Sequence, residues 1–450
     1  MDGDRRHIAA APAGGGSLGR TLLLGLYAVV ILAPLALTIG TVKPGAQGRI
    51  VVFADAIGFV ALSMIALQVI ASGRWATTTL HFGLRRILAL HRQAGMAVLL
   101  LVVGHVVILV ADDPGRLALF DIGTAPGRAR AGILALLGLI GLAWTSVARA
   151  RLNLSYERWR GLHLGLTSLV IAASFVHVVS VHAYTSLPLV REVVLILTLG
   201  AMVALFWARV GRPYATALRP YRIKAVHPER GNAVTLELTA DGHRGLRFGP
   251  GQFARLRPAH APYSLDDHPF TLSSSAERPD SPSFTVKALG DFSASIAELR
   301  AGEEVLVDGP HGEAAHDRRG GRGRLLLAAG IGITPAMSVL RTAAERGDHR
   351  PHLLLYGSRH WHDVTFREEL SELEHRLPAL RVVHVLSRPQ PGWQGEEGRV
   401  DQDLLRRYAP EDITAWSALI CGPPAMVDEI SASVLGLGVP ASAIQAEGFE

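Results

Sequence analysis

The chain has 450 residues, of which 49% are hydrophobic, and its mean hydropathy of +0.27 is too high for an ordinary soluble protein. A net charge of +6 would suit a nucleic-acid-binding protein. The basic residues, however, flank apolar segments, so membrane topology explains them and we expect no nucleic-acid ligand. The single cysteine, Cys421, excludes structural disulfides and cysteine-ligated iron–sulfur clusters.

The first half of the chain contains six apolar segments, each near the length that a transmembrane helix needs. They cover residues 21–40, 50–72, 87–111, 131–149, 159–182 and 187–208. Arg5 and Arg6 precede the first segment, as in a signal peptide. Its apolar run is longer than a typical signal core, which favours an uncleaved first helix. We therefore expect a six-helix transmembrane bundle.

The positions of Arg and Lys predict the orientation of this bundle. Twelve of these residues fall on the side of the N-terminus and six in the loops on the opposite side. Positive residues concentrate on the cytoplasmic side of membranes. Both termini are therefore expected in the cytoplasm, and the third and fifth segments run in the same direction.

These two segments carry histidines at equal spacing. His91 and His105 lie 14 residues apart in the third segment, as do His163 and His177 in the fifth. On an α-helix this separation is about 21 Å and nearly four turns, so both rings of a pair share one face. Two parallel helices would then form two facing pairs at two depths, the geometry for two stacked haems held by imidazole on both faces. The alternative, polar packing residues in a membrane anchor, is less favoured because polar groups are costly in membranes.

The second half has a different sequence pattern, in which short runs of alternating apolar and polar residues are separated by turn residues. Runs at 232–240, 251–257, 283–290 and 303–310 predict strands of a small antiparallel barrel. Further on, apolar strands at 325–330, 352–358, 380–387 and 417–422 alternate with helical patterns. Such alternation predicts a parallel sheet with helices on both faces.

Three glycine- or hydroxyl-rich motifs lie in this half. "AAGIGITP" (328–335) follows a strand, and its glycines allow close backbone approach. Thr334 is expected to cap the following helix and Pro335 to suit its first turn, which would give a pyrophosphate site. "GDFSASIAEL" (290–299) offers a second helix start, and "HPFTLSSS" (268–275) an aromatic beside hydroxyls. Each motif alone is weak, because such turns are usually structural.

Their order is far more specific than any one of them. "HPFTLSS", "GDFS", "GPHG", "GIGITP", "YGSR" and "CGPPAM" follow one another as in the ferredoxin-reductase-type flavin and nicotinamide modules. Upstream, "HRQAG…GH" and "RWRGLH…FVH" look like a ferric-reductase-type transmembrane domain. The chain thus resembles the NADPH oxidase and ferric reductase superfamily over nearly its full length. The resemblance implies a cytoplasmic tail (1–20), a six-helix di-haem domain (21–210), an FAD-binding β-barrel domain (215–318) and an NAD(P)H-binding α/β domain (322–450).

The resemblance also implies cofactor-binding residues. Phe270 would pack on the isoalloxazine of FAD, and Thr271 would hydrogen-bond near its reactive edge. His268 takes the place where many relatives carry an arginine at the flavin phosphates. The remaining residues implied at FAD are Pro269 beside Phe270, with Lys287, Gly290, Asp291, Phe292 and Ser293 on the pyrophosphate side. Relatives often end in an aromatic that covers the flavin, and Phe449 in "EGFE" stands near that place.

The nucleotide site follows from the same resemblance. The residues implied there are Gly330, Gly332, Thr334 and Pro335 at the dinucleotide, and Cys421, Gly422 and Pro423 beside the nicotinamide. For Cys421 a structural interpretation competes, that of a small buried hydrophobe at a strand end. Ser358 and Arg359 follow a strand with no carboxylate next to them, which favours NADPH over NADH. Arginine also follows this strand in NADH-using relatives.

The expected activity is electron transfer across the cell membrane. NADPH would reduce FAD, and electrons would pass to an inner haem b (His91, His163), then to an outer haem b (His105, His177), then to an acceptor. Dioxygen giving superoxide is the favoured acceptor, and a ferric chelate is the alternative. A third interpretation is a membrane-anchored flavin reductase without haem. Membrane lipid is expected around the helices, and no obligatory protein partner is indicated.

Overall fold

A computed structural model describes residues 17–41, 48–72, 84–181, 187–264, 268–288, 290–312 and 321–448. By its internal contacts the chain divides into two compact units, one ending at Pro213 and one beginning at Tyr214. The first unit is helical, and the second contains two six-stranded sheets. Each unit is described separately below.

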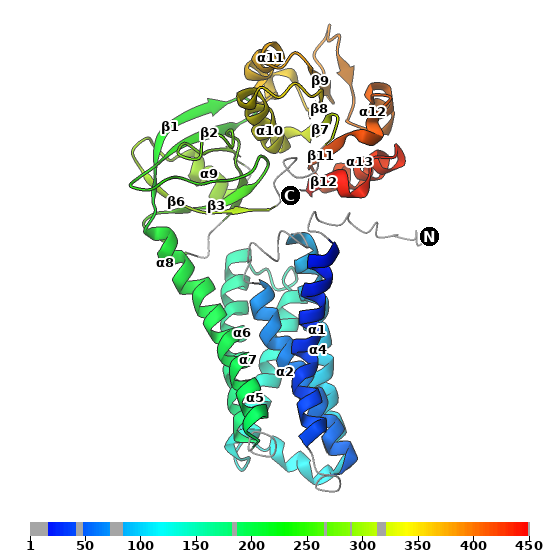
Figure 1. Ribbon diagram of the computed structural model, residues 1–450. Helices are drawn as coiled ribbons and strands as arrows, with labels where there is room; N and C mark the ends of the chain where they lie inside the picture. The colour runs from blue at the N-terminus through cyan, green and yellow to red at the C-terminus, as the bar shows by residue number, and fades with distance from the viewer. Residues whose placement is uncertain are drawn as a thin grey trace. The chain divides into compact units, whose positions relative to one another are not determined.

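The helical unit consists of long apolar helices packed side by side (Figure 1). Their bounds are α1 (Ser17–Thr41), α2 (Arg49–Ser72), α4 (Leu84–Asp112), α5 (Gly127–Val147), α6 (Tyr156–Ser180) and α7 (Pro188–Phe206). Among the described residues, five of these helices are long and apolar enough to cross a membrane, whereas the apolar part of α1 is shorter, at Thr21–Leu37. The chain is therefore a multi-pass membrane protein.

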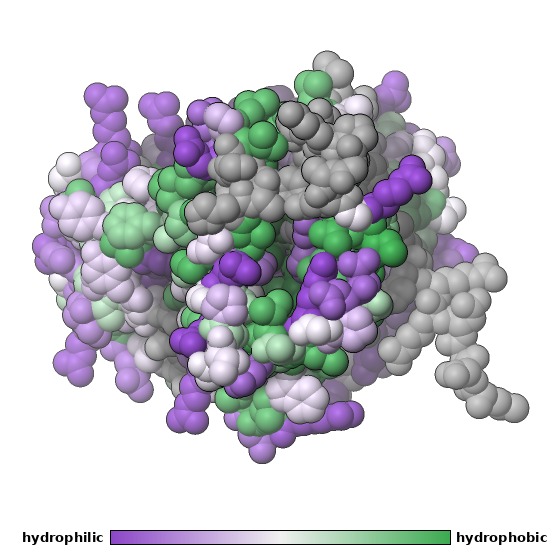
Figure 2. Space-filling model, turned by 90° about the horizontal axis from the view of Figure 1, so that it is seen from below, coloured by the Kyte–Doolittle hydropathy of each residue, from purple (hydrophilic) through white to green (hydrophobic). Residues whose placement is uncertain are grey.

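Large hydrophobic side chains remain exposed on these helices. Leu100 on α4 and Ile196 on α7 are 70% and 71% exposed, and Leu22 on α1 is 63% exposed. Viewed from below, hydrophobic side chains reach the surface among hydrophilic ones (Figure 2). A soluble protein rarely exposes so much apolar surface, whereas in lipid such residues face the hydrocarbon.

Three short elements adjoin the long helices. A 3₁₀ helix, η1 (Pro114–Phe120), follows α4, and the side chain of Asp113 caps it by accepting from Gly115 N at 3.0 Å. At the other end, α7 continues through a single π-helical stretch, η2 (Trp207–Gly211), into α8 (Arg212–Ala217).

The first sheet of the second unit is antiparallel, with strand order β4-β3-β6-β1-β2-β5. Its strands are β1 (Tyr221–Glu229), β2 (Ala233–Ala240), β3 (Phe253–Pro258), β4 (His268–Thr271), β5 (Ser283–Lys287) and β6 (Glu304–His311). One isolated bridge, Leu272 to Phe284, joins the two edges. The expected barrel is thus only partly closed among the described residues. A short helix, α9 (Asp291–Ala297), follows β5.

The second sheet is parallel throughout, with strand order β10-β9-β8-β7-β11-β12. Its strands are β7 (Arg324–Ala329), β8 (His352–Ser358), β9 (Leu380–Leu386), β10 (Glu396–Glu397), β11 (Ser417–Gly422) and β12 (Ile444–Gly448). The chain adds strands in one direction from β7 and then returns to place β11 on the other side of β7. This reversal is a topological switch point, where open α/β sheets bind ligands at the carboxyl ends of their strands.

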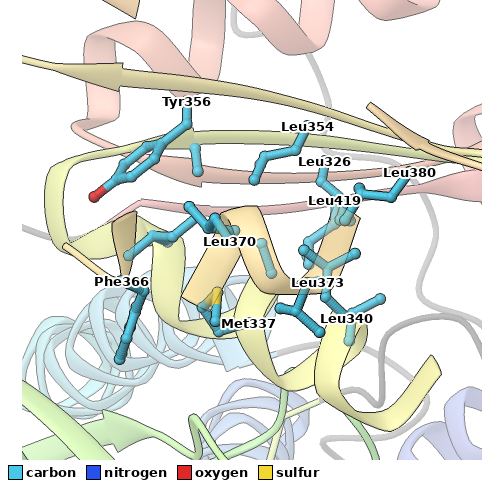
Figure 3. Packing of buried hydrophobic residues seen from close by; sticks show 14 of the residues in the cluster. Leu326, Met337, Leu340, Leu354, Tyr356, Phe366, Leu370, Leu373, Leu380 and Leu419 are labelled. Atoms are coloured by element: carbon cyan, nitrogen blue, oxygen red, sulfur yellow. The ribbon is translucent and has the colours of Figure 1, made fainter. Parts of the chain in front are cut away.

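Helices cover both faces of this sheet, as the sequence predicted. On one face α10 (Ile333–Arg346) and α11 (Arg367–Arg376) pack Met337, Leu340 and Leu370 against the strands (Figure 3). On the other face α12 (Gln402–Tyr408) and α13 (Pro424–Gly436) form a second buried cluster. The strands are apolar on both sides because both sides are covered.

Candidate functional site

The structure brings His91 on α4 and His163 on α6 together. Their ring centroids are 6.3 Å apart and their planes are inclined by 55°. Within the described segments, the Nδ1 atoms of both rings are buried without a hydrogen-bond partner. Trp159, one turn before His163, lies 5.2 Å from its ring. We call His91 and His163 the first histidine pair.

His105 and His177, 14 residues later on the same two helices, form the second histidine pair. They interact electrostatically with each other. Unlike the first pair, both of their Nδ1 atoms have partners: His105 bonds to the carbonyl oxygen of Ala54 at 2.7 Å and His177 to that of Arg128 at 2.8 Å. The N-terminal histidine of α4 pairs with that of α6, and the C-terminal histidine of α4 with that of α6. The two helices therefore run in the same direction.

The first pair fits an ion bound between its rings. A metal–imidazole bond is about 2 Å long, so two imidazoles on opposite sides of one ion have centroids roughly 6 Å apart. The measured 6.3 Å agrees with this spacing. In the second pair the Nδ1 bonds fix the tautomer, so each ring has Nε2 available as a ligand. Both pairs therefore offer the donor set of a bis-imidazole haem site.

The flavin motif forms β4, at the edge of the antiparallel sheet. Phe270 pairs in register with Ala254 and Thr271 with Phe253 of β3. Phe270 is half-buried and packs against the sheet's core, and Thr271 is also half-buried. His268 begins this strand, and Pro269 is exposed. The expected flavin residues therefore share one strand, with an aromatic ring that is only partly covered.

The second glycine motif begins α9. Lys287 ends β5, and Gly290 precedes the helix with open space where a side chain would be. The Gly290 amide is already bonded to Ser293 Oγ at 2.9 Å. Asp291 and Phe292 form the first turn of the helix. The cation and the helix start are thus on consecutive elements, and a pyrophosphate site there stays a prediction.

Three motifs meet at the carboxyl edge of the parallel sheet. Gly330 follows β7, Ser358 ends β8 and Cys421 lies near the end of β11, and these three strands are neighbours. Gly330 has φ +54, a conformation that favours glycine, with open space beside its Cα. The sheet therefore gathers the predicted nucleotide residues at its switch point.

One expectation about this turn was wrong. Thr334 does not cap the helix: α10 begins at Ile333 with Gly332 at the N-cap. The Thr334 hydroxyl instead donates back to the carbonyl oxygen of Ile331 at 3.1 Å. Thr334 and Pro335 are both buried in the first turn. The side chains of Thr334 and Pro335 thus belong to the packing at the start of α10.

Cys421 is buried at the end of β11, opposite Ala328 on one side and Glu447 on the other. Burial, with a further effect of Glu447, raises the pKa of its thiol. The side chain is therefore a neutral thiol and not a nucleophilic thiolate. Gly422 follows, where a Cβ would come 2.9 Å from Met426 Sδ, and Pro423 precedes α13.

Ser358 and Arg359 differ in their surroundings. Ser358 Oγ is buried, and in the part of the chain that the structure describes it has no partner in hydrogen-bond geometry. Arg359 is exposed, and among the described residues no ion pair engages its guanidinium. An unpaired guanidinium at the edge of a nucleotide site suits a phosphate ligand. Phe449, the expected flavin cover, lies outside the described residues.

The two sheets are held together by α10. Ser338 Oγ donates to the carbonyl oxygen of Ser274 at 2.9 Å, and Arg341 donates to that of Ser273 at 2.6 Å. Arg341 also pairs with Glu369 at 2.6 Å. The helix that begins at the nucleotide turn thus packs on the segment that follows the flavin strand, which fixes the two predicted sites relative to each other.

The fold and site define a multi-pass membrane protein joined to a two-domain oxidoreductase. Comparison with known families agrees: residues 57–191 match the ferric reductase like transmembrane component, 220–315 an FAD-binding domain and 326–432 an oxidoreductase NAD-binding domain. The chain belongs to the NADPH oxidase and ferric reductase superfamily, as its sequence motifs predicted.

Three proteins are similar to the part of the chain that matches the FAD- and NAD-binding domains. The reductase component of the naphthalene 1,2-dioxygenase/salicylate 5-hydroxylase systems of Ralstonia sp is 31% identical over 241 residues, which cover 50% of this chain and 70% of that protein. NADH-cytochrome b5 reductase 1 of Pyricularia oryzae is 30% identical, with 38% of this chain and 56% of that protein covered. The cytochrome b5 reductase domain of Ulva prolifera nitrate reductase aligns with a TM-score of 0.44 and 21% identity, over 49% of this chain and 92% of that domain.

Proposed function

We propose that the protein takes electrons from NADPH and delivers them across the membrane to dioxygen, with superoxide as the product. A ferric-reductase-like transmembrane domain fused to a flavin reductase module supports transmembrane electron transfer from NAD(P)H. The observation that carries the proposal is the first histidine pair, whose 6.3 Å centroid separation suits one ion between two imidazoles.

The proposal assigns each cofactor to residues of this chain. The first histidine pair would hold an inner haem b and the second pair an outer one. FAD would lie against Phe270 and Thr271, with its phosphates near His268, Lys287 and the start of α9. When bound, the flavin supplies the conversion of a two-electron donor into one-electron transfers, and the haems supply one-electron carriers between the membrane faces.

The chain's own residues have positioning roles in this scheme. The turn at Gly330 and Gly332 would present amides to the dinucleotide, and Arg359 would pair with the 2′-phosphate of NADPH. Cys421, kept neutral by burial, would form part of the wall beside the nicotinamide without reacting. Phe449 is proposed to cover the flavin.

The topology completes the proposal. We infer that α1 is a sixth membrane span and that the domains lie at 1–20, 21–210, 215–318 and 322–450. The excess of Arg and Lys on one side supports a cytoplasmic location for both termini and for the flavin and nucleotide domains. NADPH would then be oxidised in the cytoplasm, and the acceptor would be reduced on the far side of the cell membrane.

A ferric chelate is the second candidate acceptor, and the match to the ferric reductase like transmembrane component favours it. Both acceptors need only an outer haem edge near the surface, so the electron path is common to both. A haem-free flavin reductase with a membrane anchor is the third candidate.

The test uses the purified full-length chain with saturating FAD. We expect the absorption of six-coordinate haem at about two haems per chain, and reduction of both by NADPH without oxygen. Two acceptor assays then separate the candidates. Dismutase-sensitive reduction of an external dye supports dioxygen, and turnover that depends on an impermeant ferric chelate supports the metal reductase. A protein that shows flavin absorption but no haem absorption, and still oxidises NADPH, would exclude both.

A further inference from the structure

Two glycines lie against the second histidine pair. Gly58 on α2 is so close to His105 that a Cβ at this position would be 3.2 Å from its Nδ1. Gly132 on α5 stands in the same relation to His177, at 2.9 Å. Real Cβ atoms essentially never approach a neighbour below 3.0 Å. Any side chain at Gly132 would therefore displace the ring, and one at Gly58 would press on it.

Each glycine comes four residues after the carbonyl that the imidazole contacts. Ala54 O, bonded to His105, precedes Gly58 by four, and Arg128 O, bonded to His177, precedes Gly132 by four. In an α-helix the carbonyl oxygen of each residue accepts a hydrogen bond from the amide of the residue four positions later in the sequence. That oxygen has a second lone pair. With no side chain on the fourth residue, a donor from another helix can reach this lone pair. We call each such arrangement a carbonyl notch.

A carbonyl notch lies beside each member of the second pair. The two sequences that form it, "ADAIG" (54–58) and "RARAG" (128–132), share little except the final glycine. In the first pair, His91 Nδ1 and His163 Nδ1 are buried without a hydrogen-bond partner in the described part of the chain. The two pairs thus differ in one respect. Both histidines of the second pair have an acceptor for Nδ1–H, and in the described residues neither histidine of the first pair has one.

An acceptor at Nδ1 changes how the ring acts as a ligand. A hydrogen bond from the outer ring nitrogen fixes the tautomer and orientation of a metal-binding imidazole and raises its basicity. A more basic ligand gives more electron density to iron and favours the oxidised metal. Second-shell hydrogen bonding of this kind is one of the means by which a protein sets a haem potential.

We propose that Gly58 and Gly132 are positioning residues that admit His105 and His177 to helix carbonyls, and so give the second haem a lower midpoint potential than the first. The inference rests on the proposed function, because it takes the histidine pairs to be haem ligands. It goes beyond that function by assigning roles to two glycines and an order to the two potentials.

Charged side chains lie near both pairs. Asp55, the residue after Ala54, and Arg128 both interact electrostatically with His177, whereas Arg209 on η2 interacts with His163. At the second pair the opposite charges of Asp55 and Arg128 oppose each other, and at the first pair the positive charge of Arg209 favours the reduced iron. Arg209 therefore adds to the difference that the notches create.

The test is an anaerobic spectroelectrochemical titration of the haem-loaded full-length protein in lipid. In the unmodified protein we expect two midpoints, and His177→Leu should remove the lower one. Gly132→Ala should raise the lower midpoint by about 59 mV, which corresponds to a tenfold change in a one-electron equilibrium constant, and leave the upper one unchanged. Gly58→Ala should give a smaller shift, because its added Cβ would lie further from the imidazole.

The matched control is Gly200→Ala on α7, where no atom lies within 4 Å of an added Cβ. It should leave both midpoints unchanged. The proposal is overturned if His177→Leu removes the upper midpoint, if neither glycine variant shifts the lower one, or if Gly200→Ala shifts it equally. If Gly132→Ala does not fold, Gly58→Ala decides the question.

A second readout does not need haem. Solid-state ¹⁵N NMR of histidine-labelled protein should show His105 and His177 as Nδ1–H tautomers, with mixed tautomers appearing in the glycine variants. Protein that binds no haem but keeps these tautomers would contradict the proposed function and still support the hydrogen bonds to the carbonyl notches. Protein that binds two haems with equal potentials and no fixed tautomer would support the function and overturn the notch.

Discussion

The hydroxyl of Tyr356 donates a hydrogen bond to the carbonyl oxygen of Gly330 at 3.1 Å, so the end of β8 holds the turn that follows β7. Burial raises the pKa of Tyr356 to about 12, and the phenol therefore remains a donor at any physiological pH. The turn that we assign to the dinucleotide is thus fixed by a neighbouring strand and not by its own residues alone.

Replacing Tyr356 with Phe removes this bond and keeps the packing of the ring. A hydrogen bond contributes about 0.5–1.5 kcal/mol net, so we expect the KM for NADPH to rise by roughly two- to tenfold. Steady-state kinetics with a soluble dye as acceptor would measure this. Tyr408→Phe, which removes a bond to Glu396 in the same domain, serves as the control. Equal effects of the two variants would contradict the role of the Gly330 turn.

Phe270→Ala should weaken the retention of FAD, since it removes an aromatic surface from the ring system. Phe270→Tyr should retain the flavin, because the ring remains. The ratio of flavin to protein after gel filtration gives the result, and haem content should be the same in both variants. If the alanine variant keeps its FAD with normal affinity, β4 is not the flavin strand.

Arg359→Ala tests the choice between nucleotides. Loss of one charge-assisted contact costs about 1.5–3 kcal/mol, so the KM for NADPH should rise about tenfold or more while that for NADH hardly changes. Arg376→Ala, an exposed arginine on α11, should change neither. Parallel losses with both nucleotides would show that Arg359 does not bind the 2′-phosphate.

The order of the membrane carriers is tested by two leucine variants. His177→Leu should abolish reduction of an impermeant external acceptor, while NADPH still reduces the flavin and the first haem. His163→Leu should stop transfer directly after the flavin, so that any remaining second haem stays oxidised. Stopped-flow absorption with NADPH separates these outcomes. External reduction that survives His177→Leu, or fast reduction of the second haem in His163→Leu, would reverse the order.

His384 on β9 should make the soluble unit less stable in acid. Burial, with a further effect of Arg367, lowers the pKa of His384 to about 4. Between the unfolded value near 6.5 and this folded value, the unfolded state binds more protons. Stability should therefore be complete above about pH 6.5 and fall towards pH 4, by at most about 3 kcal/mol.

Hydrogen exchange of the β9 amides as a function of pH measures this loss. His384→Gln should flatten the dependence in that pH range, because the titrating group is gone. His362→Gln, at an exposed histidine in the same domain, should leave the dependence as it is. An unchanged slope in His384→Gln would assign the acid sensitivity to another group.

The sequence predicted most of the fold because its strongest signals are local. Apolar runs of about 20 residues leave few alternatives to membrane helices, and β7, β8, β9 and β11 are apolar enough to be recognised alone. The strands it did not predict are β1, β4, β10 and β12, which are very short or weaker in pattern. β1 includes Pro228 and several charges, and two of the five residues of β12 are polar. These strands form because neighbours pair with them, which is information that no local pattern contains.

The candidate site was only partly predictable for a related reason. The spacing of the histidines led to the pairing of His91 with His163, because side-chain periodicity is readable in one dimension. The acceptors of the second pair are the main-chain oxygens of Ala54 and Arg128, and Gly58 and Gly132 contribute the lack of a side chain. Backbone acceptors on another helix and an absent Cβ leave no residue-type signature in the sequence.

The contacts between α10 and the flavin domain have a consequence for how this enzyme could change over time. Ser338 and Arg341 donate to the main-chain oxygens of Ser274 and Ser273, and every amino acid supplies such an oxygen. Mutations in these two serines that keep the backbone in position therefore leave the acceptors in place, so these two contacts do not depend on the serine side chains. Recombination that introduces a diverged flavin domain of the same backbone shape would preserve these contacts.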